Sequence, residues 1–152
     1  MAATLSRATP DPAAAAVDAG LAFFCYFRAE LRTRKPGGLS MPQFRALSIL
    51  AKEPDRSLGD IAEDLGVSPP ALSKMADALV ERGLLDRAAD AVDRRRVTLA
   101  LTPAGARLVA GFRRDLEEGL AARMAALPAR SRTAIAMALQ DLQAVLAPQV
   151  AA

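Results

Sequence analysis

The residues of this chain best suited to binding chemistry are three consecutive arginines, Arg94, Arg95 and Arg96. They end the segment AADAVDRRR, which separates two apolar segments and is too long for a two-residue turn. Cationic side chains on a projecting loop suit the narrow, electronegative minor groove of DNA. A run of charges is more often only a solvated loop, so the DNA interpretation depends on the elements beside it.

The segment before this loop predicts two short helices joined by a tight turn. The first helix begins after Ser57, a good N-cap, and ends at Gly66, which adopts a left-handed C′ conformation without steric cost. Residues one turn apart then define its buried side: Leu58, Ile61, Ala62 and Leu65.

The second predicted helix begins after Ser68, and Pro69 and Pro70 occupy first-turn positions whose N–H groups have no intrahelical partner. It ends at Gly83. Its apolar stripe follows the spacing of one helix face: Leu72, Met75, Ala76, Leu79 and Val80.

The outward face at the start of this second helix is a candidate reader of the major groove. Lys74 donates hydrogen bonds to guanine or phosphate, and Ser73 both donates and accepts them. The acids Asp77 and Glu81 come later, where the helix leaves the groove. The full set of candidate residues on this helix is Ser68, Pro69, Pro70, Ala71, Ser73 and Lys74.

Two strands flank the arginine loop, from residues 84 to 87 and 97 to 101. In the second strand apolar and other residues alternate, which predicts one buried face and one solvent face. The buried set is Val97, Leu99 and Leu101, and the solvent set is Arg96, Thr98 and Ala100. Two helices followed by such a hairpin define a winged helix-turn-helix in a mostly α-helical (α+β) protein.

These residues resemble the MarR (multiple antibiotic resistance regulator) family. The order of elements, GLLDR after the second helix and above all DRRRVTLALTPAG carry the resemblance, which is specific from Ser57 to Gly105 and rests on helix order and length elsewhere. The wing of that family reads Asp-x-Arg-(Arg/Asp), matched here from Asp93 to Arg96. The resemblance implies a dimeric transcriptional regulator, and it places Arg95 in the minor groove. Asp93 is expected to shape the wing, because phosphates repel a carboxylate.

Length and charge agree with one nucleic-acid-binding domain. The chain has 152 residues, a formal net charge of +3 and a pI of about 9.6. We expect a disordered tail over residues 1–12 and one domain over residues 13–152, with the DNA-binding lobe at about 40–102. From Ser57 to Arg96 acids outnumber bases, so the argument rests on where the cations lie.

The composition excludes several functional classes. The chain has no histidine and one cysteine, which leaves no metal-site spacing, no Cys–His nucleophile and no disulfide framework. Nor does it contain a nucleotide motif, so we expect no enzyme activity, no cofactor and no metal. Without an apolar stretch of about 18 residues or a signal peptide, we expect no membrane association and a cytoplasmic location.

Long helices are predicted on both sides of the lobe, over about 13–34 and 103–147. The last of them has a seam at three- and four-residue spacing, formed by Ile135, Leu139, Leu142 and Leu146, which suits a partner helix. In MarR-like proteins the first and last helices of two chains interlock, and the first also lines a ligand pocket. The resemblance therefore implies a homodimer with a hydrophobic pocket at Phe24, Phe27 and Phe44, open to a small aromatic or hydrophobic effector.

Cys25 has two interpretations. Some relatives sense organic peroxides through a cysteine in the first helix, paired with tyrosines. Here the only tyrosine, Tyr26, is adjacent and points elsewhere on a helix, so we expect Cys25 to be a small buried hydrophobe. Arg45 and Arg56 are candidate phosphate contacts, although single arginines are usually solvated.

The sequence thus predicts a repressor that binds a palindromic double-stranded operator as a homodimer and is released by a small ligand. Two alternatives stay open: a redox sensor through Cys25 on the same fold, and a winged-helix protein-interaction domain that does not bind DNA. The arginines of the wing argue against the second alternative, because an adaptor has no need to project them.

Overall fold

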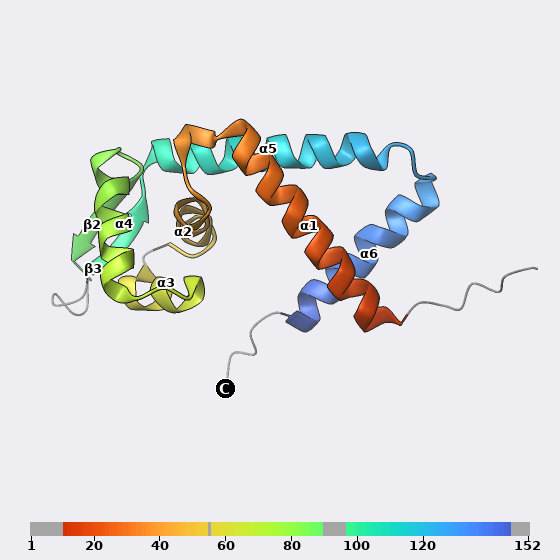
Figure 1. Ribbon diagram of the computed structural model, residues 1–152, viewed down its shortest axis with the longest axis horizontal. Coiled ribbons are helices and arrows are strands. Elements are labelled where there is room, and N and C mark those ends of the chain that lie inside the picture. Colours follow the sequence, from red (N-terminus) through yellow and green to blue (C-terminus); the bar gives the residue numbers. More distant parts are fainter. Residues whose placement is uncertain (1–10, 55, 90–96, 147–152) are drawn as a thin grey trace, which may run out of the picture. The chain divides into compact units, whose positions relative to one another are not determined.

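The structure is a computed structural model, and it describes residues 11–54, 56–89 and 97–146. They form a mostly α-helical fold with one small antiparallel sheet, as the sequence predicts (Figure 1). In chain order the elements are α1 (Pro12–Arg34), the 3₁₀ helix η1 (Pro36–Gly38), α2 (Met41–Lys52), β1 (Arg56–Ser57), α3 (Leu58–Leu65), α4 (Pro69–Glu81), β2 (Leu85–Ala89), β3 (Val97–Leu101), α5 (Pro103–Met124) and α6 (Ala129–Leu146).

The first two long helices begin at side-chain caps. The carboxylate of Asp11 accepts hydrogen bonds from the backbone N–H groups of Ala13 and Ala14, so α1 starts at Pro12, one residue before the predicted start. Residues 1–10 of the predicted tail lie outside the described residues. The helix α2 begins with a capping box, in which Ser40 and Gln43 each accept a hydrogen bond from the other's backbone N–H.

The helix-turn-helix boundaries match the predicted chemistry. The Ser57 side chain accepts from the N–H of Asp60 at 3.2 Å, and Ser68 accepts from the N–H of Ala71 at 3.4 Å. Gly66 has φ +66°, the left-handed conformation expected of a glycine that ends a helix.

The sheet has three strands in the order β1-β3-β2, and the sequence did not predict β1. This two-residue strand pairs with β3 through Arg56 opposite Leu99 and Ser57 opposite Thr98. The predicted solvent exposure of Thr98 is therefore wrong: only 7% of this residue is exposed, because β3 is the central strand. Leu99, on the predicted buried face, is fully buried.

The LT-x-x-G segment after the sheet joins β3 to α5 through close backbone contacts. The Thr102 hydroxyl donates to the carbonyl of Gly83 at 2.7 Å and accepts from the N–H of Gly105 at 3.0 Å. A Cβ atom at position 105 would overlap the carbonyl oxygen of Leu84. Only glycine therefore fits at this crossing of helix and strand.

The aromatic rings of Phe27, Phe44 and Phe112 contact one another. The ring centroid of Phe44 lies 4.7 Å from that of Phe112, and the centroid of Phe27 lies 5.7 Å from Phe44 and 5.8 Å from Phe112. Tilted and edge-to-face pairs of this kind add to the stabilisation from burial. The cluster joins α1, α2 and the first part of α5.

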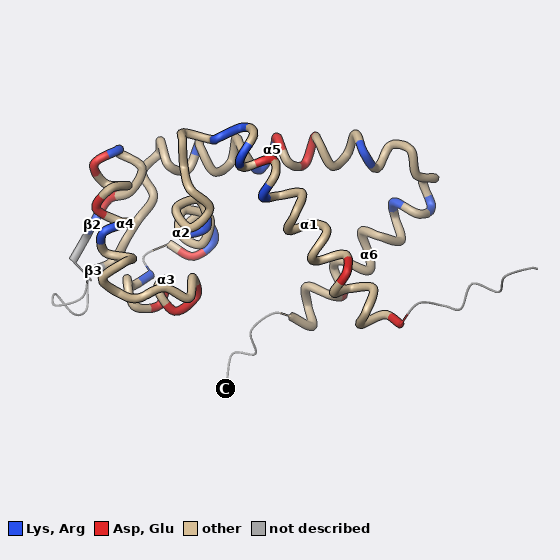
Figure 2. Tube along the Cα trace, in the orientation of Figure 1, with Lys and Arg blue, Asp and Glu red and all other residues tan. Residues whose placement is uncertain are grey.

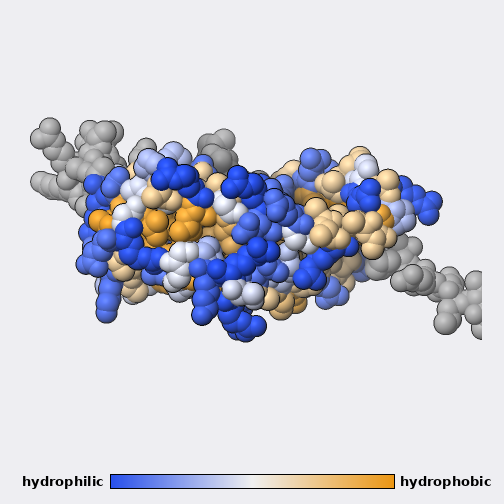
Figure 3. Space-filling model, turned by 90° about the horizontal axis from the view of Figure 1, so that it is seen from above, coloured by the Kyte–Doolittle hydropathy of each residue, from blue (hydrophilic) through white to orange (hydrophobic). Residues whose placement is uncertain are grey.

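The chain divides into two compact units, Met1–Phe112 and Arg113–Ala152. The physical reason lies in burial: every buried hydrophobic residue among those described belongs to the first unit. Large apolar side chains of α6 are exposed instead, including Met137, Leu139 and Val145. Figure 3 shows a different part of the surface, where apolar residues also lie among charged ones.

Candidate nucleic-acid interface

The geometry of the helix-turn-helix fixes which face of α4 is available to a partner. The N–H of Val67 donates to the carbonyl of Ala62 at 3.0 Å, which holds the turn between α3 and α4. Leu72 and Leu79 are fully buried against the rest of the first unit. Since these residues fix the inner face of α4, the opposite face points to solvent (Figure 1).

Four of the residues predicted to contact DNA lie exposed at the N-terminal end of α4, namely Pro69, Pro70, Ala71 and Lys74. Ser68 is exposed too, with its hydroxyl oxygen used as the helix cap. Lys74 pairs with no acid among the described residues, so its ammonium group is available to an anionic or base-edge acceptor. Small side chains around one free cation leave room for close approach to a groove.

Ser73, another predicted DNA contact, is half-buried and engaged with a residue that the sequence did not single out. The guanidinium of Arg87, on β2, donates to the Ser73 carbonyl at 3.2 Å and to its hydroxyl oxygen at 3.4 Å. The same nitrogen lies 2.8 Å from a carboxylate oxygen of Asp77. The contact joins α4 to the strand that follows it across the turn at residues 82–84, so helical periodicity does not identify it.

The wing itself is described only at its base. The ladder between β2 and β3 continues to the pair Ala89 and Val97, and residues 90–96 lie outside the described residues. The predicted contacts Arg94, Arg95 and Arg96, and the predicted wing-shaping residue Asp93, all fall in that segment. Their roles stay predictions.

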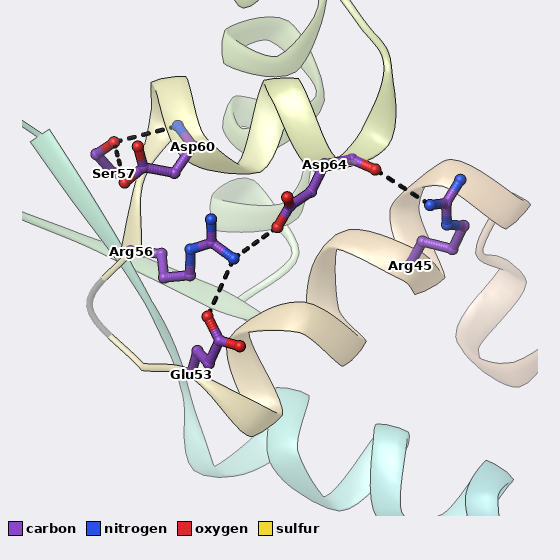
Figure 4. Close-up of polar contacts among 6 residues, drawn as sticks. All are labelled: Arg45, Glu53, Arg56, Ser57, Asp60 and Asp64. Atoms are coloured by element: carbon purple, nitrogen blue, oxygen red, sulfur yellow. Dashed lines mark hydrogen bonds and ion pairs between the residues drawn. The ribbon is translucent and has the colours of Figure 1, made fainter. Parts of the chain in front are cut away.

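A polar network braces α3 against α2 (Figure 4). Arg56 forms ion pairs with Asp64 at 2.5 Å and with Glu53 at 3.1 Å, and Arg45 donates to the Asp64 carbonyl at 3.2 Å. Arg45 is exposed, as expected for a single arginine, whereas Arg56 is half-buried and pairs with two carboxylates. An arginine at the last carbonyls of α3 also complements the negative end of that helix.

The charges on the two helices of the motif differ (Figure 2). The helix α3 carries only acids, Asp60, Glu63 and Asp64, whereas α4 carries Lys74 near its N-terminal end and the acids Asp77 and Glu81 further on. Asp77 has its charge offset by Arg87. Lys74 thus favours the approach of phosphates at the N-terminal end of α4.

The predicted pocket residues do not form one group. Phe27 and Phe44 belong to the aromatic cluster with Phe112, whereas Phe24 is half exposed and borders a shallow hollow of about 200 Å³ on α1. Cys25 borders the same hollow and is exposed. The expectation that Cys25 is buried is wrong for the single chain, since this side of α1 has no described neighbour that covers it.

Among the described residues no group of three or more His, Cys, Asp or Glu side chains is placed to hold a metal ion. No helix that the structure describes is both long and apolar enough to span a bilayer.

A helix-turn-helix with an outward second helix, followed by a two-stranded wing, defines a winged-helix DNA-binding transcription regulator. A family model described as the MarR family matches residues 39–97. The HTH-type transcriptional regulator MT0903.1 of Mycobacterium tuberculosis is 36% identical over 118 residues, which cover 77% of this chain and 82% of that protein. The chain belongs to the MarR family.

Solved structures agree with this assignment of the fold. RV1404 from Mycobacterium tuberculosis superposes with a TM-score of 0.74 at 25% identity, over 92% of this chain and 99% of that chain. MepR, a transcription regulator of the multidrug efflux pump MepA of Staphylococcus aureus, has a TM-score of 0.66 at 20% identity, over 83% of this chain and 93% of that chain. The order of helices and the winged motif are therefore those of a known fold.

Proposed function

We propose that this protein is a homodimeric repressor that binds a palindromic operator and releases it when a small molecule binds. The observation that carries the proposal is the exposed N-terminal end of α4, where Lys74 is surrounded by small side chains on a helix fixed by Leu72 and Leu79. In this proposal α4 enters the major groove and Arg94, Arg95 and Arg96 reach the adjacent minor groove. Asp93 shapes the wing.

Relatives support the DNA-binding part of the proposal. The HTH-type transcriptional repressor MdtR of Bacillus subtilis is 33% identical over 75 residues, which cover 49% of this chain and 48% of that protein. A MepR F27L mutant of Staphylococcus aureus, with a TM-score of 0.61 over 91% of this chain and 99% of that chain, is described as bound to an oligodeoxyribonucleotide. The same fold therefore binds DNA in another protein.

Exposed apolar side chains support the dimer. Phe23 and Phe24 on α1, with Met137 and Leu139 on α6, are all half exposed or more. Side chains of this size are usually covered in a soluble protein. A second copy that covers them would place two α4 helices about 34 Å apart, in successive major grooves.

Ligand release would act through the spacing of the two lobes. A ligand shifts the population toward a spacing that does not fit the half-sites only if it binds that state more tightly. The aromatic cluster of Phe27, Phe44 and Phe112 joins α1 to the lobe, so a ligand near it could change that spacing. A small aromatic or hydrophobic effector suits such surroundings.

The first experiment measures binding of the purified protein to DNA upstream of its own coding sequence, with unrelated DNA as competitor, across a series of salt concentrations. We expect Arg95→Ala to weaken specific binding and to reduce the salt slope by about one unit, because one phosphate-proximal cation is lost. Arg113→Ala, which removes a cation from an exposed ion pair of α5, is the control. Weak binding that ignores sequence and the Arg95 substitution would favour a protein-interaction domain instead.

Lys74→Ala distinguishes the role of α4. If Lys74 contacts a base, the substitution costs roughly 1–3 kcal/mol and relaxes the preference at one position of the operator. If it contacts phosphate, binding to all sequences weakens alike. An unchanged affinity for every sequence would remove Lys74 from the interface.

A redox function is the second candidate, and the exposure of Cys25 favours it. An accessible thiol on the helix that contributes to the dimer is open to oxidation by peroxide. The test compares peroxide-induced release of DNA by the wild type and by Cys25→Ser. Equal release by both proteins would exclude Cys25 as the sensor.

A further inference from the structure

The side chain of Arg87 connects two parts of the candidate interface, the base of the wing on β2 and the helix α4. Its backbone lies in β2, paired with the fully buried Leu99 of β3, so its position in the sheet is fixed. Its guanidinium reaches across to α4, where it contacts Ser73 and Asp77. One side chain thus joins the base of the wing to the middle of the recognition helix.

The spacing of the partners on α4 suits the shape of an arginine. Ser73 and Asp77 are four residues apart, which places them one above the other on the same side of the helix. A guanidinium is a planar donor that can serve both the carboxylate and the backbone carbonyl, whereas a lysine ammonium is a point charge on a flexible stem. The Arg87 side chain is 33% exposed and that of Asp77 is 57% exposed, so the contact lies at the surface that a partner would approach.

We propose that Arg87 is a positioning residue, which fixes the base of the wing against α4 and so sets the distance between the major-groove and minor-groove contacts. This inference rests on the proposed function, since it describes how one DNA-binding surface is held in shape. It also assigns Ser73 and Asp77 to the support of that surface. Ser73 then contributes to affinity through Arg87 and not by reading a base.

The competing explanation is that Arg87 contacts a DNA phosphate directly. Substitution of Asp77 distinguishes this explanation from the proposed positioning role. If Arg87 is only a cation beside the DNA, then removing the nearby acid in Asp77→Ala should tighten binding, because a repulsive charge is lost. If Arg87 positions the wing through Asp77, the same substitution should weaken binding. The two explanations predict changes of opposite sign.

The test is a double-mutant cycle of Asp77→Ala and Arg87→Ala, with affinity for the specific DNA as the readout. We expect each single variant to bind about fivefold more weakly, which is near the upper end for one exposed ion pair. The double variant should also bind about fivefold more weakly, because the second substitution removes a partner already lost. Arg87→Lys should behave like Arg87→Ala. Tighter binding by Asp77→Ala, or a double variant with the product of the two single effects, would overturn the proposal.

A second readout without DNA separates this proposal from the proposed function. Hydrogen exchange of the backbone amides of β2 and β3 should be faster in Asp77→Ala and in Arg87→Ala than in the wild type, and unchanged in the control Arg113→Ala. Faster exchange in a protein that binds no specific DNA would support the role of Arg87 and contradict the proposal that the protein is a repressor. Unchanged exchange in a protein that does bind its operator would overturn the role of Arg87 alone.

Discussion

The two compact units of this chain differ in where their apolar side chains lie. In the unit Met1–Phe112, the helix-turn-helix and the sheet enclose a core with fully buried side chains such as Leu47, Ile61 and Leu99. In the unit Arg113–Ala152, the described residues include no buried side chain, and Leu139 is 50% exposed. Composition does not explain the contrast, because leucine and alanine recur in both units.

This difference indicates which part of the chain buries its apolar side chains with its own residues. The lobe with α3 and α4 satisfies its helix ends, buries its apolar faces and fixes its outward surface with its own residues. The apolar seam of α6 is exposed among the described residues, with Leu139 and Leu146 half exposed or more, so burial of that seam requires another surface. In the proposed function the lobe contacts DNA, and the C-terminal unit contacts a second copy of the chain.

The largest expected effect compares two leucines. Leu47→Ala should lower the free energy of unfolding by about 3 kcal/mol, because it leaves a cavity in a fully packed site. Leu139→Ala should have a much smaller effect on the isolated chain, and should weaken self-association instead. Chemical denaturation at several protein concentrations measures both the free energy of unfolding and the contribution of self-association to it. Equal, concentration-independent losses in the two variants would contradict the contrast between the units.

The next effect concerns two glycines of α5. Gly105→Ala should destabilise the protein by about 2 kcal/mol, since its methyl group meets the Leu84 carbonyl. Gly111→Ala is the matched control: a Cβ atom there has no neighbour within 4 Å, so the substitution should stabilise the helix by roughly 0.5–1 kcal/mol. Thermal and denaturant unfolding measure the sign of the change in stability for each variant. A neutral Gly105→Ala would show that the crossing of helix and strand is looser than described.

A smaller effect is expected at the start of α4. Ser68→Ala should cost about 1 kcal/mol, because the N–H of Ala71 loses its side-chain acceptor. Ser131, in the first turn of α6, makes no side-chain hydrogen bond among the described residues, and Ser131→Ala should be neutral to slightly stabilising. Unfolding curves of the two variants provide the comparison. A Ser68→Ala variant as stable as the wild type would exclude the cap.

The smallest effect compares two arginine ion pairs. Arg56 is 24% exposed and contacts two carboxylates, so Arg56→Ala should lower stability by about 1 kcal/mol. Arg113 pairs with Glu117 on the open face of α5, and its side chain is 72% exposed, so Arg113→Ala should change stability by less than about 0.5 kcal/mol. High salt should reduce both effects. A larger loss at Arg113 than at Arg56 would contradict the brace between α2 and α3.

Local chemistry made most of the fold predictable. Ser57, Gly66 and Ser68 act over three or four residues, so the sequence alone predicts where α3 and α4 begin and end. The same rules cannot predict β1, because two residues have no periodicity and their pairing depends on β3. The burial of Thr98 follows from that pairing, so the sequence alone does not predict it either.

The candidate site was predictable only where its residues are close in sequence. The exposed end of α4 follows from the apolar stripe on its other side, so Lys74 was found. The contact of Arg87 with Ser73 and Asp77 joins a helix to the strand after it, and neither helical periodicity nor GLLDR reveals it. Exposure of Cys25 was missed for a related reason, because burial on α1 depends on what lies against it.

The most direct test of the central claim is a hydroxyl-radical footprint of the purified protein on DNA upstream of its own coding sequence. A dimer with one α4 helix in each of two successive major grooves should protect two inverted half-sites about one helical turn apart, with added minor-groove protection from the wings. Arg95→Ala should remove the minor-groove protection first. A single unpaired half-site, or no protection beyond that of unrelated DNA, would contradict the account.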